Sequence, residues 1–132
     1  MIDRFSPAKV APPFSRYSHG VEVPAGARVV VVAGQVGVHP NGATADGIAA
    51  QTEQALLNIA AILAEKGMGL ADLVETRTYM TDPDDLPGYR EGRARAFATC
   101  EPVPCPAAAL VFVAGLAQPQ WKIEICAMAA KI

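Results

Sequence analysis

Charged residues are scarce in this 132-residue chain: they make up 18% of the sequence, with 11 Lys and Arg against 13 Asp and Glu. With 52% hydrophobic residues the composition excludes a disordered chain, and it predicts that part of the surface is covered in an oligomer. A net charge of −2 supplies no basic field for phosphates, so no nucleic-acid partner is expected. The length favours a single domain over residues 1–132.

Long hydrophobic runs are also absent. The longest apolar stretches, Val29–Ala33 and Ala55–Ala64, fall well short of the roughly 20 residues that span a bilayer. The first residues, Met1–Pro7, lack the basic and apolar regions of a secretory signal. We therefore expect a protein of the cytoplasm that makes no membrane contact.

Cysteine and histidine are too few, and too poorly spaced, for the common metal and disulfide frameworks. Cys100, Cys105 and Cys126 form an odd set without CxxC spacing, which predicts free thiols. His19 and His39 have no acidic or thiol partner at ligand spacing, so no metal site is expected. The signatures of serine hydrolases, phosphate-binding loops, dinucleotide folds and zinc proteases are all missing.

The apolar patterning predicts the element order ββαβαββ. Two strands lie between Gly20 and Ala33, and the second, Arg28–Ala33, is predicted to be buried on both faces. Apolar residues spaced three and four apart predict a helix over Asp46–Lys66, with Asp46 as N-cap and Gly67 after its end. The remaining predicted elements are a strand at Leu73–Thr81, a helix at Leu86–Ala98, and strands at Ala108–Val113 and Trp121–Ala129.

This order favours one mixed sheet with both helices on a single face. The other face then needs cover, and a second copy of the sheet is the expected cover. The last strand alternates, with Ile123 and Ile125 on one face and Glu124 on the other. Glu124 is therefore either a carboxylate with a partner or ligand or a member of a solvated face. Tyr17 either packs or offers its hydroxyl to a ligand.

Five segments together resemble the RidA family, also called YjgF or L-PSP, over about residues 12–130. The segments that carry the resemblance are Arg16–Val21, Ala33–Val36, Gln51–Ile59, Val74–Asp82 and Lys122–Ala127. The resemblance implies a chorismate-mutase-like α+β fold, a mixed six-stranded sheet with two helices on one face. It also implies a homotrimer whose sheets form a central barrel, with small-molecule pockets between subunits. Typical members hydrolyse reactive enamines or imines to 2-oxo acids and ammonia without a cofactor.

Carried over by position, the resemblance assigns roles to several residues. Tyr17 helps to close the pocket, Glu124 positions the attacking water, and Gly34 is the loop glycine after the second strand. The arginine that binds the substrate carboxylate in typical members falls on Ala108. Loss of such a bidentate contact removes about 1.5–3 kcal/mol of binding, which argues against ordinary 2-imino acid deaminase activity.

Three further substrate-binding positions differ from the typical pattern. Ala33 replaces a serine or similar residue, Arg90 replaces an asparagine, and Leu110 replaces a cysteine. The predicted pocket is therefore more apolar than usual, and we hypothesise that Arg90 supplies a cation from a different direction.

Three functions compete at this point. The first is a divergent hydrolase or deaminase of a small enamine, imine or carbonyl metabolite, with Glu124 handling water. The second is a non-catalytic trimer that binds a small molecule. The third follows the label endoribonuclease or translation inhibitor, which the pI of about 5.6 and the single Trp disfavour.

Overall fold

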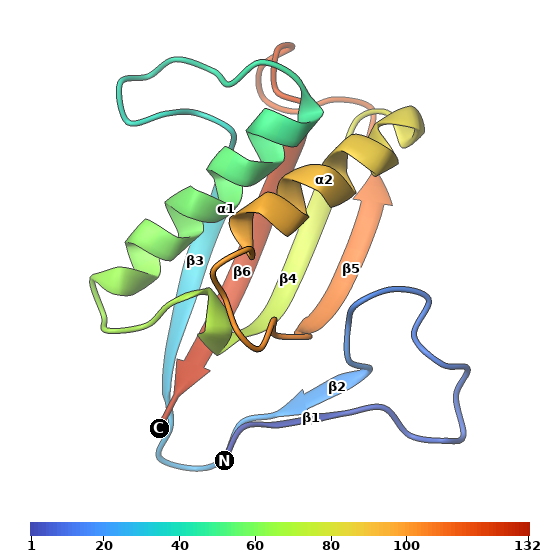
Figure 1. The fold of residues 1–132 in the computed structure, drawn as a ribbon, viewed down its shortest axis with the longest axis vertical. Helices are drawn as coiled ribbons and strands as arrows, with labels where there is room; N and C mark the ends of the chain where they lie inside the picture. Colours follow the sequence, from blue (N-terminus) through green and yellow to red (C-terminus); the bar gives the residue numbers. More distant parts are fainter.

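Two helices lie side by side across one face of a four-stranded sheet (Figure 1), as the computed structural model of residues 1–132 shows. The helices are α1 (Ile48–Ala64) and α2 (Leu86–Ala96), and the strands are β1 (Asp3–Phe5), β2 (Gly20–Glu22), β3 (Arg28–Val36), β4 (Leu73–Met80), β5 (Ala107–Phe112) and β6 (Ile123–Lys131). Single 3₁₀ turns precede β4 and α2 at Leu70–Asp72 and Pro83–Asp85. The predicted α+β class and the order ββαβαββ from β2 onward are confirmed. No helix has the length and apolar character needed to cross a membrane.

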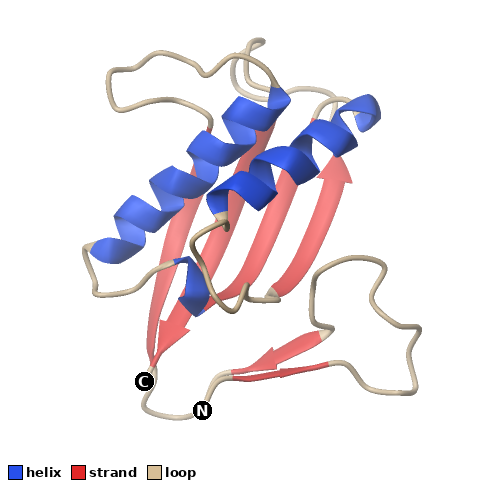
Figure 2. Ribbon diagram, in the orientation of Figure 1, coloured by secondary structure: helices blue, strands red, loops and turns tan.

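The main sheet has the strand order β3-β6-β4-β5, in which β4 and β5 are parallel and the other pairs antiparallel. The predicted six-stranded sheet needs correction, because β1 and β2 form a separate two-stranded sheet below it (Figure 2). The three-residue β2 pairs with β1, and the Phe5 ring lies directly over Gly20. β2 therefore pairs with β1 and not with a strand of the main sheet, and the turn after Pro24 separates it from β3.

Strand β3 is buried on one face only, which corrects the prediction of burial on both faces. Val32 packs in the core beneath the helices, whereas Val29 and Val31 are 50% and 69% exposed. The run of β-branched residues predicts the strand correctly but does not reveal how many layers cover it. In a single chain no second layer covers this face, and the sheet is open rather than a closed barrel.

The first helix begins and ends at glycines. Gly47, with φ of 87°, is the N-cap, and no side chain caps the helix, so the prediction of Asp46 as N-cap was wrong. Gly67, with φ of 71°, ends the helix as predicted: its amide donates to the Ala64 carbonyl, and the Met68 amide donates to that of Leu63. These bonds turn the chain toward β4.

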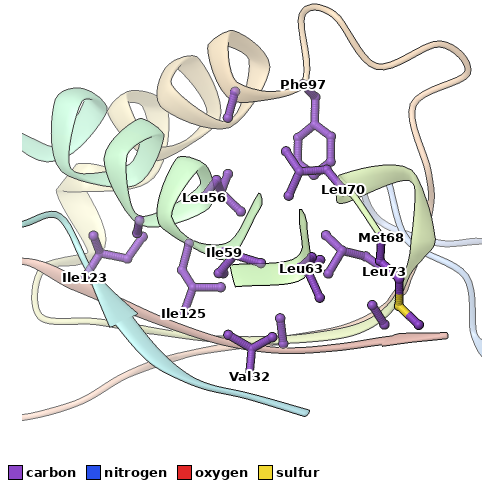
Figure 3. Packing of buried hydrophobic residues seen from close by; sticks show 14 of the residues in the cluster. Val32, Leu56, Ile59, Leu63, Met68, Leu70, Leu73, Phe97, Ile123 and Ile125 are labelled. Atoms are coloured by element: carbon purple, nitrogen blue, oxygen red, sulfur yellow. The ribbon is translucent and has the colours of Figure 1, made fainter. Parts of the chain in front are cut away.

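The core lies between the helices and the sheet (Figure 3). Ile59 and Leu63 of α1 face Ile123 and Ile125 of β6, and each is at most 1% exposed. The alternation predicted for β6 is confirmed, because these isoleucines occupy the helix-facing side. Consequently Glu124, between them, points to the open face of the sheet.

The side chain of Gln51 fixes the approach to β6. It is 2% exposed, donates to the carbonyls of Ala45 at 3.2 Å and Gln120 at 3.0 Å, and accepts from the Lys122 amide at 2.9 Å. Helix α1 is thereby joined to the residues immediately before Glu124, so the start of β6 has a defined position.

Candidate functional site

Glu124 lies against Gly34 on the open face of the sheet. Strand β3 shifts its register against β6 between Val32 and Gln35, and this irregularity places Gly34 beside the carboxylate. A Cβ built on Gly34 would overlap Glu124 Oε2 and would lie 2.8 Å from Cδ and 3.1 Å from Cγ. Only a residue without a side chain allows the carboxylate to occupy this position.

A cavity of about 700 Å³ lies on the other side of the sheet, between α2 and strands β4 and β5. Most of its lining is apolar, and Phe97, Leu110 and Val103 contribute to it. Its polar groups are arginines, two tyrosines and the hydroxyl groups of Ser15 and of two threonines from β4, together with the Cys100 thiol and the carboxylate of Glu101. An apolar cavity with a few polar groups is the usual form of a small-molecule site.

The loop that carries Tyr17 is fastened to the start of β5. Ser18 donates from its hydroxyl to the Cys105 carbonyl at 2.7 Å and from its amide to the Pro106 carbonyl at 3.2 Å. The Tyr17 hydroxyl accepts the Phe14 amide at 3.2 Å, which holds the turn in place. The loop is therefore held beside Pro106, two residues before Ala108, although more than eighty residues separate the loop from β5 in sequence.

Three arginines line the cavity: Arg16 from the loop, and Arg90 and Arg93 from α2. Arg93 is engaged within the chain, since its guanidinium lies 4.9 Å from the centre of the Phe97 ring and donates to the Arg16 carbonyl at 3.4 Å. The ion pairs of the chain join Arg77 to Glu75 and Arg95 to Glu91. Arg16 and Arg90 form no ion pair and are exposed.

The chain brings four of the seven predicted site residues together. Tyr17, Arg90, Ala108 and Leu110 line the cavity. The other three, Ala33, Gly34 and Glu124, are not part of it, because Ala33 and Gly34 lie in the irregular part of β3 and Glu124 faces away from the helices. The seven residues therefore fall into two groups on opposite faces of the sheet.

Sequence reasoning missed Arg16 as a cavity residue. Its position depends on the Ser18 bonds to Cys105 and Pro106, a long-range contact that no local pattern announces. The one local indication of its role is its position immediately before Tyr17, a predicted site residue.

Cys100 also lines the cavity, and burial raises the pKa of its thiol above the ordinary value of 9.0, with Glu101 and Asp72 raising it further. All three cysteines are free thiols. No group of three or more His, Cys, Asp or Glu side chains is close enough to hold a metal ion.

Comparison with known proteins identifies the family. The family model described as Endoribonuclease L-PSP matches residues 8–131, nearly the whole chain. The chain belongs to the RidA (L-PSP) family. A relative from Salmonella typhimurium named 2-iminobutanoate/2-iminopropanoate deaminase is 33% identical over 127 residues, which cover 96% of this chain and 92% of the relative. The corresponding Escherichia coli K12 protein has the same name and is 32% identical, with the same coverage.

Solved structures of RidA proteins agree with this assignment. The Rid family protein YyfB from Yersinia pestis superimposes with a TM-score of 0.83 at 34% identity, covering 98% of both chains. The Escherichia coli TdcF structure, solved with bound serine, gives a TM-score of 0.74 at 26% identity and covers 98% of this chain and 100% of its own. The RidA fold is therefore shared over the full length of the domain.

Proposed function

We propose that this RidA protein is a cofactor-free hydrolase that deaminates a small reactive imine or enamine, or attacks a related carbonyl compound, in a site between two copies of a homotrimer. Relatives that are 32–33% identical over almost the whole chain are named imine deaminases, which supports this reaction class. The seven residues Tyr17, Ala33, Gly34, Arg90, Ala108, Leu110 and Glu124 are the proposed site.

The observation that carries the proposal is the position of Glu124 against Gly34. A carboxylate held on a strand beside an exposed glycine can accept a proton from water while a substrate approaches the glycine backbone closely. Water adds to the imine carbon, and the carboxylate takes one of its protons and passes it to nitrogen, which gives a carbinolamine. The carboxylate then moves the hydroxyl proton to the same nitrogen, so that the carbon–nitrogen bond breaks with ammonia as the leaving group while the carbonyl forms. The products are ammonia and the carbonyl compound, so atoms and charge balance.

A second copy is required because Glu124 and the cavity occupy opposite faces of one sheet. Val29 and Val31 leave an apolar patch on the face of Glu124, at 50% and 69% exposure, which favours burial against another copy. We propose that the Glu124 half-site of one copy closes over the cavity of its neighbour. Cyclic assembly of this kind repeats the same contact between each pair of copies.

The alanine at position 108 shapes the substrate range. It is exposed at the edge strand β5 and lines the cavity, so a long cationic side chain there would reach into the cavity. Without it, the smallest imino acids lose a bidentate partner for the carboxylate. We expect Ala108→Arg to raise turnover of freshly generated 2-iminopropanoate by about tenfold or more. No increase would contradict the assignment of position 108 to the substrate site.

The catalytic role of Glu124 is tested by Glu124→Gln. Ammonia and 2-oxo acid release from freshly generated imines should fall by about a hundredfold or more, while trimer formation and binding of the 2-oxo acid product stay unchanged. Unaltered turnover would remove Glu124 from the mechanism.

A non-catalytic trimer that binds a small molecule is the second candidate, and Ala108 favours it because the typical substrate arginine is missing. Binding of a 2-oxo acid by the parent protein, with no ammonia release from any imine tested, would select this candidate. The endoribonuclease activity in the family description receives no support from a net charge of −2.

A further inference from the structure

We infer that Arg16 and Arg90 together form the anion clamp of the cavity, and that the cavity selects 2-imino and 2-oxo acids with a bulky apolar side chain. This inference rests on the proposed function and names the substrate class for the same site. The inference depends on the positions of the two arginines, on the absence of ion pairs to them, and on the size and lining of the cavity.

The position of Arg16 follows from three hydrogen bonds. Ser18 binds the carbonyls of Cys105 and Pro106, and Arg93 donates to the carbonyl of Arg16 itself at 3.4 Å. The backbone of residue 16 is therefore attached both to the start of β5 and to α2. An arginine at this point reaches the cavity beside Ala108, where the chain lacks an arginine.

Arg90 approaches the same cavity from α2. It lies one helical turn before Arg93 and Ala94, which also line the cavity, so it faces β5 rather than the opposite side of the helix. Arg95, which points elsewhere, is neutralised by Glu91 at an i,i+4 spacing. On this helix Arg95, outside the cavity, forms an ion pair, whereas Arg90, which lines the cavity, forms none.

The charge balance of the cavity favours an anion. Three guanidinium groups line it against one carboxylate, Glu101, and Arg93 is occupied by Phe97 and a backbone carbonyl. Two guanidinium groups from different elements can bind the two oxygens of one carboxylate, as a single bidentate arginine does elsewhere.

The volume and lining favour a bulky apolar body on the ligand. About 700 Å³ falls within the range of about 300–1,000 Å³ that accommodates drug-sized ligands, well above the need of a three- or four-carbon imino acid. Leu86, Phe97, Val103 and Leu110 supply apolar surface, and Tyr89 adds an aromatic ring. Burial of a branched aliphatic or aromatic side chain against these groups adds binding that a methyl group cannot provide.

Binding of 2-oxo acids by calorimetry tests the clamp separately from turnover. The parent protein should bind phenylpyruvate and 4-methyl-2-oxopentanoate at least about tenfold more tightly than pyruvate. Arg16→Ala and Arg90→Ala should each weaken phenylpyruvate binding by about ten- to a hundredfold, and Arg16→Lys should restore part of the loss. Arg95→Ala removes the same charge from the outer side of α2 and is the matched control, so its affinity should equal that of the parent.

Three results would overturn the inference: pyruvate binding as tightly as phenylpyruvate, equal losses in Arg95→Ala and Arg90→Ala, or no binding of any of these acids. The first would mean that the apolar lining does not contact the side chain of the acid, and the second that the arginines act only through net charge. Failure of the proposed function gives a different result. In that case Glu124→Gln would bind the 2-oxo acids and release ammonia from imines as the parent protein does. Ammonia release from the imines of leucine and phenylalanine then measures turnover of the same side chains whose 2-oxo acids are used for binding.

Discussion

The carboxylate of Glu124 occupies the space that a side chain at position 34 would need. The two residues come from neighbouring strands, β6 and β3, and the register shift between Val32 and Gln35 brings them together. Glycine at this position therefore leaves the space that the carboxylate occupies. The relationship connects a local irregularity of the sheet to the proposed chemistry.

Gly34→Ala should lower activity by about a hundredfold without unfolding the protein. The new methyl group would displace the carboxylate, whose Cδ lies 2.8 Å from the ideal Cβ position, and a misplacement of about 1 Å costs about a hundredfold in rate. The measurement is imine hydrolysis together with circular dichroism. Gly115→Ala is the control, because nothing lies within 4 Å of its Cβ position. Full activity in Gly34→Ala would mean that the carboxylate position is not catalytic.

Val31→Glu should prevent assembly while leaving the single chain folded. Val31 is 69% exposed in one copy, so the substitution should change the free energy of unfolding of that copy by less than about 0.5 kcal/mol. A charge buried without a partner at the contact between copies would oppose association. Sedimentation velocity should report a monomer for Val31→Glu and a trimer for Leu57→Glu, a control at an exposed position on α1. A trimeric Val31→Glu would place the interface elsewhere.

Gln51→Leu should lower the free energy of unfolding by about 2–3 kcal/mol, because it leaves the buried Ala45 carbonyl and the part-buried Gln120 carbonyl and Lys122 amide without their partner. Urea denaturation measures the change. Gln54 of the same helix contacts only Asn58 through its side chain, so Gln54→Leu should change stability much less. Equal effects of the two variants would show that Gln51 does not hold the start of β6.

Alkylation of Cys100 should depend on pH with a midpoint above 9.0, because burial together with Glu101 and Asp72 raises the pKa of the thiol. The folded state holds the thiol proton more strongly than the unfolded state. The resulting contribution to stability is therefore present below pH 9.0 and is lost as pH rises through the folded-state pKa. Iodoacetamide labelling followed by peptide mass spectrometry gives the midpoint. A midpoint at or below 9.0 would contradict the assigned environment.

Local patterns were sufficient to predict the two α-helices and strands β2 to β6. The three- and four-residue spacing from Ile48 to Leu63 and the alternation around Ile123 and Ile125 each reflect burial on one face, and both predictions are confirmed. The end of the first helix at Gly67 was predictable because the positive φ there favours glycine. The start was not, because Asp46 offered a side-chain cap while the backbone used Gly47.

Features that depend on long-range contact could not be predicted from local patterns. The pairing of β2 with β1 depends on a three-residue strand, Asp3–Phe5, too short to give a periodic signal. The valines of β3 predicted burial on both faces, but no second layer of the chain covers the outer face, where Val29 and Val31 are exposed. Arg16 lines the cavity because Ser18 binds the start of β5, a contact between residues far apart in the sequence.

Subunit mixing tests most directly the claim that Glu124 of one copy serves the cavity of another. Glu124→Gln removes the carboxylate, and Ala108→Trp fills the cavity, so each homotrimer should be inactive. After the two variants are unfolded and refolded together in equal amounts, about a quarter of the sites should combine an intact Glu124 with an intact cavity. We predict that ammonia release from the imine of phenylalanine returns to about a quarter of the parent rate. Mixed trimers that form but stay inactive would contradict the account.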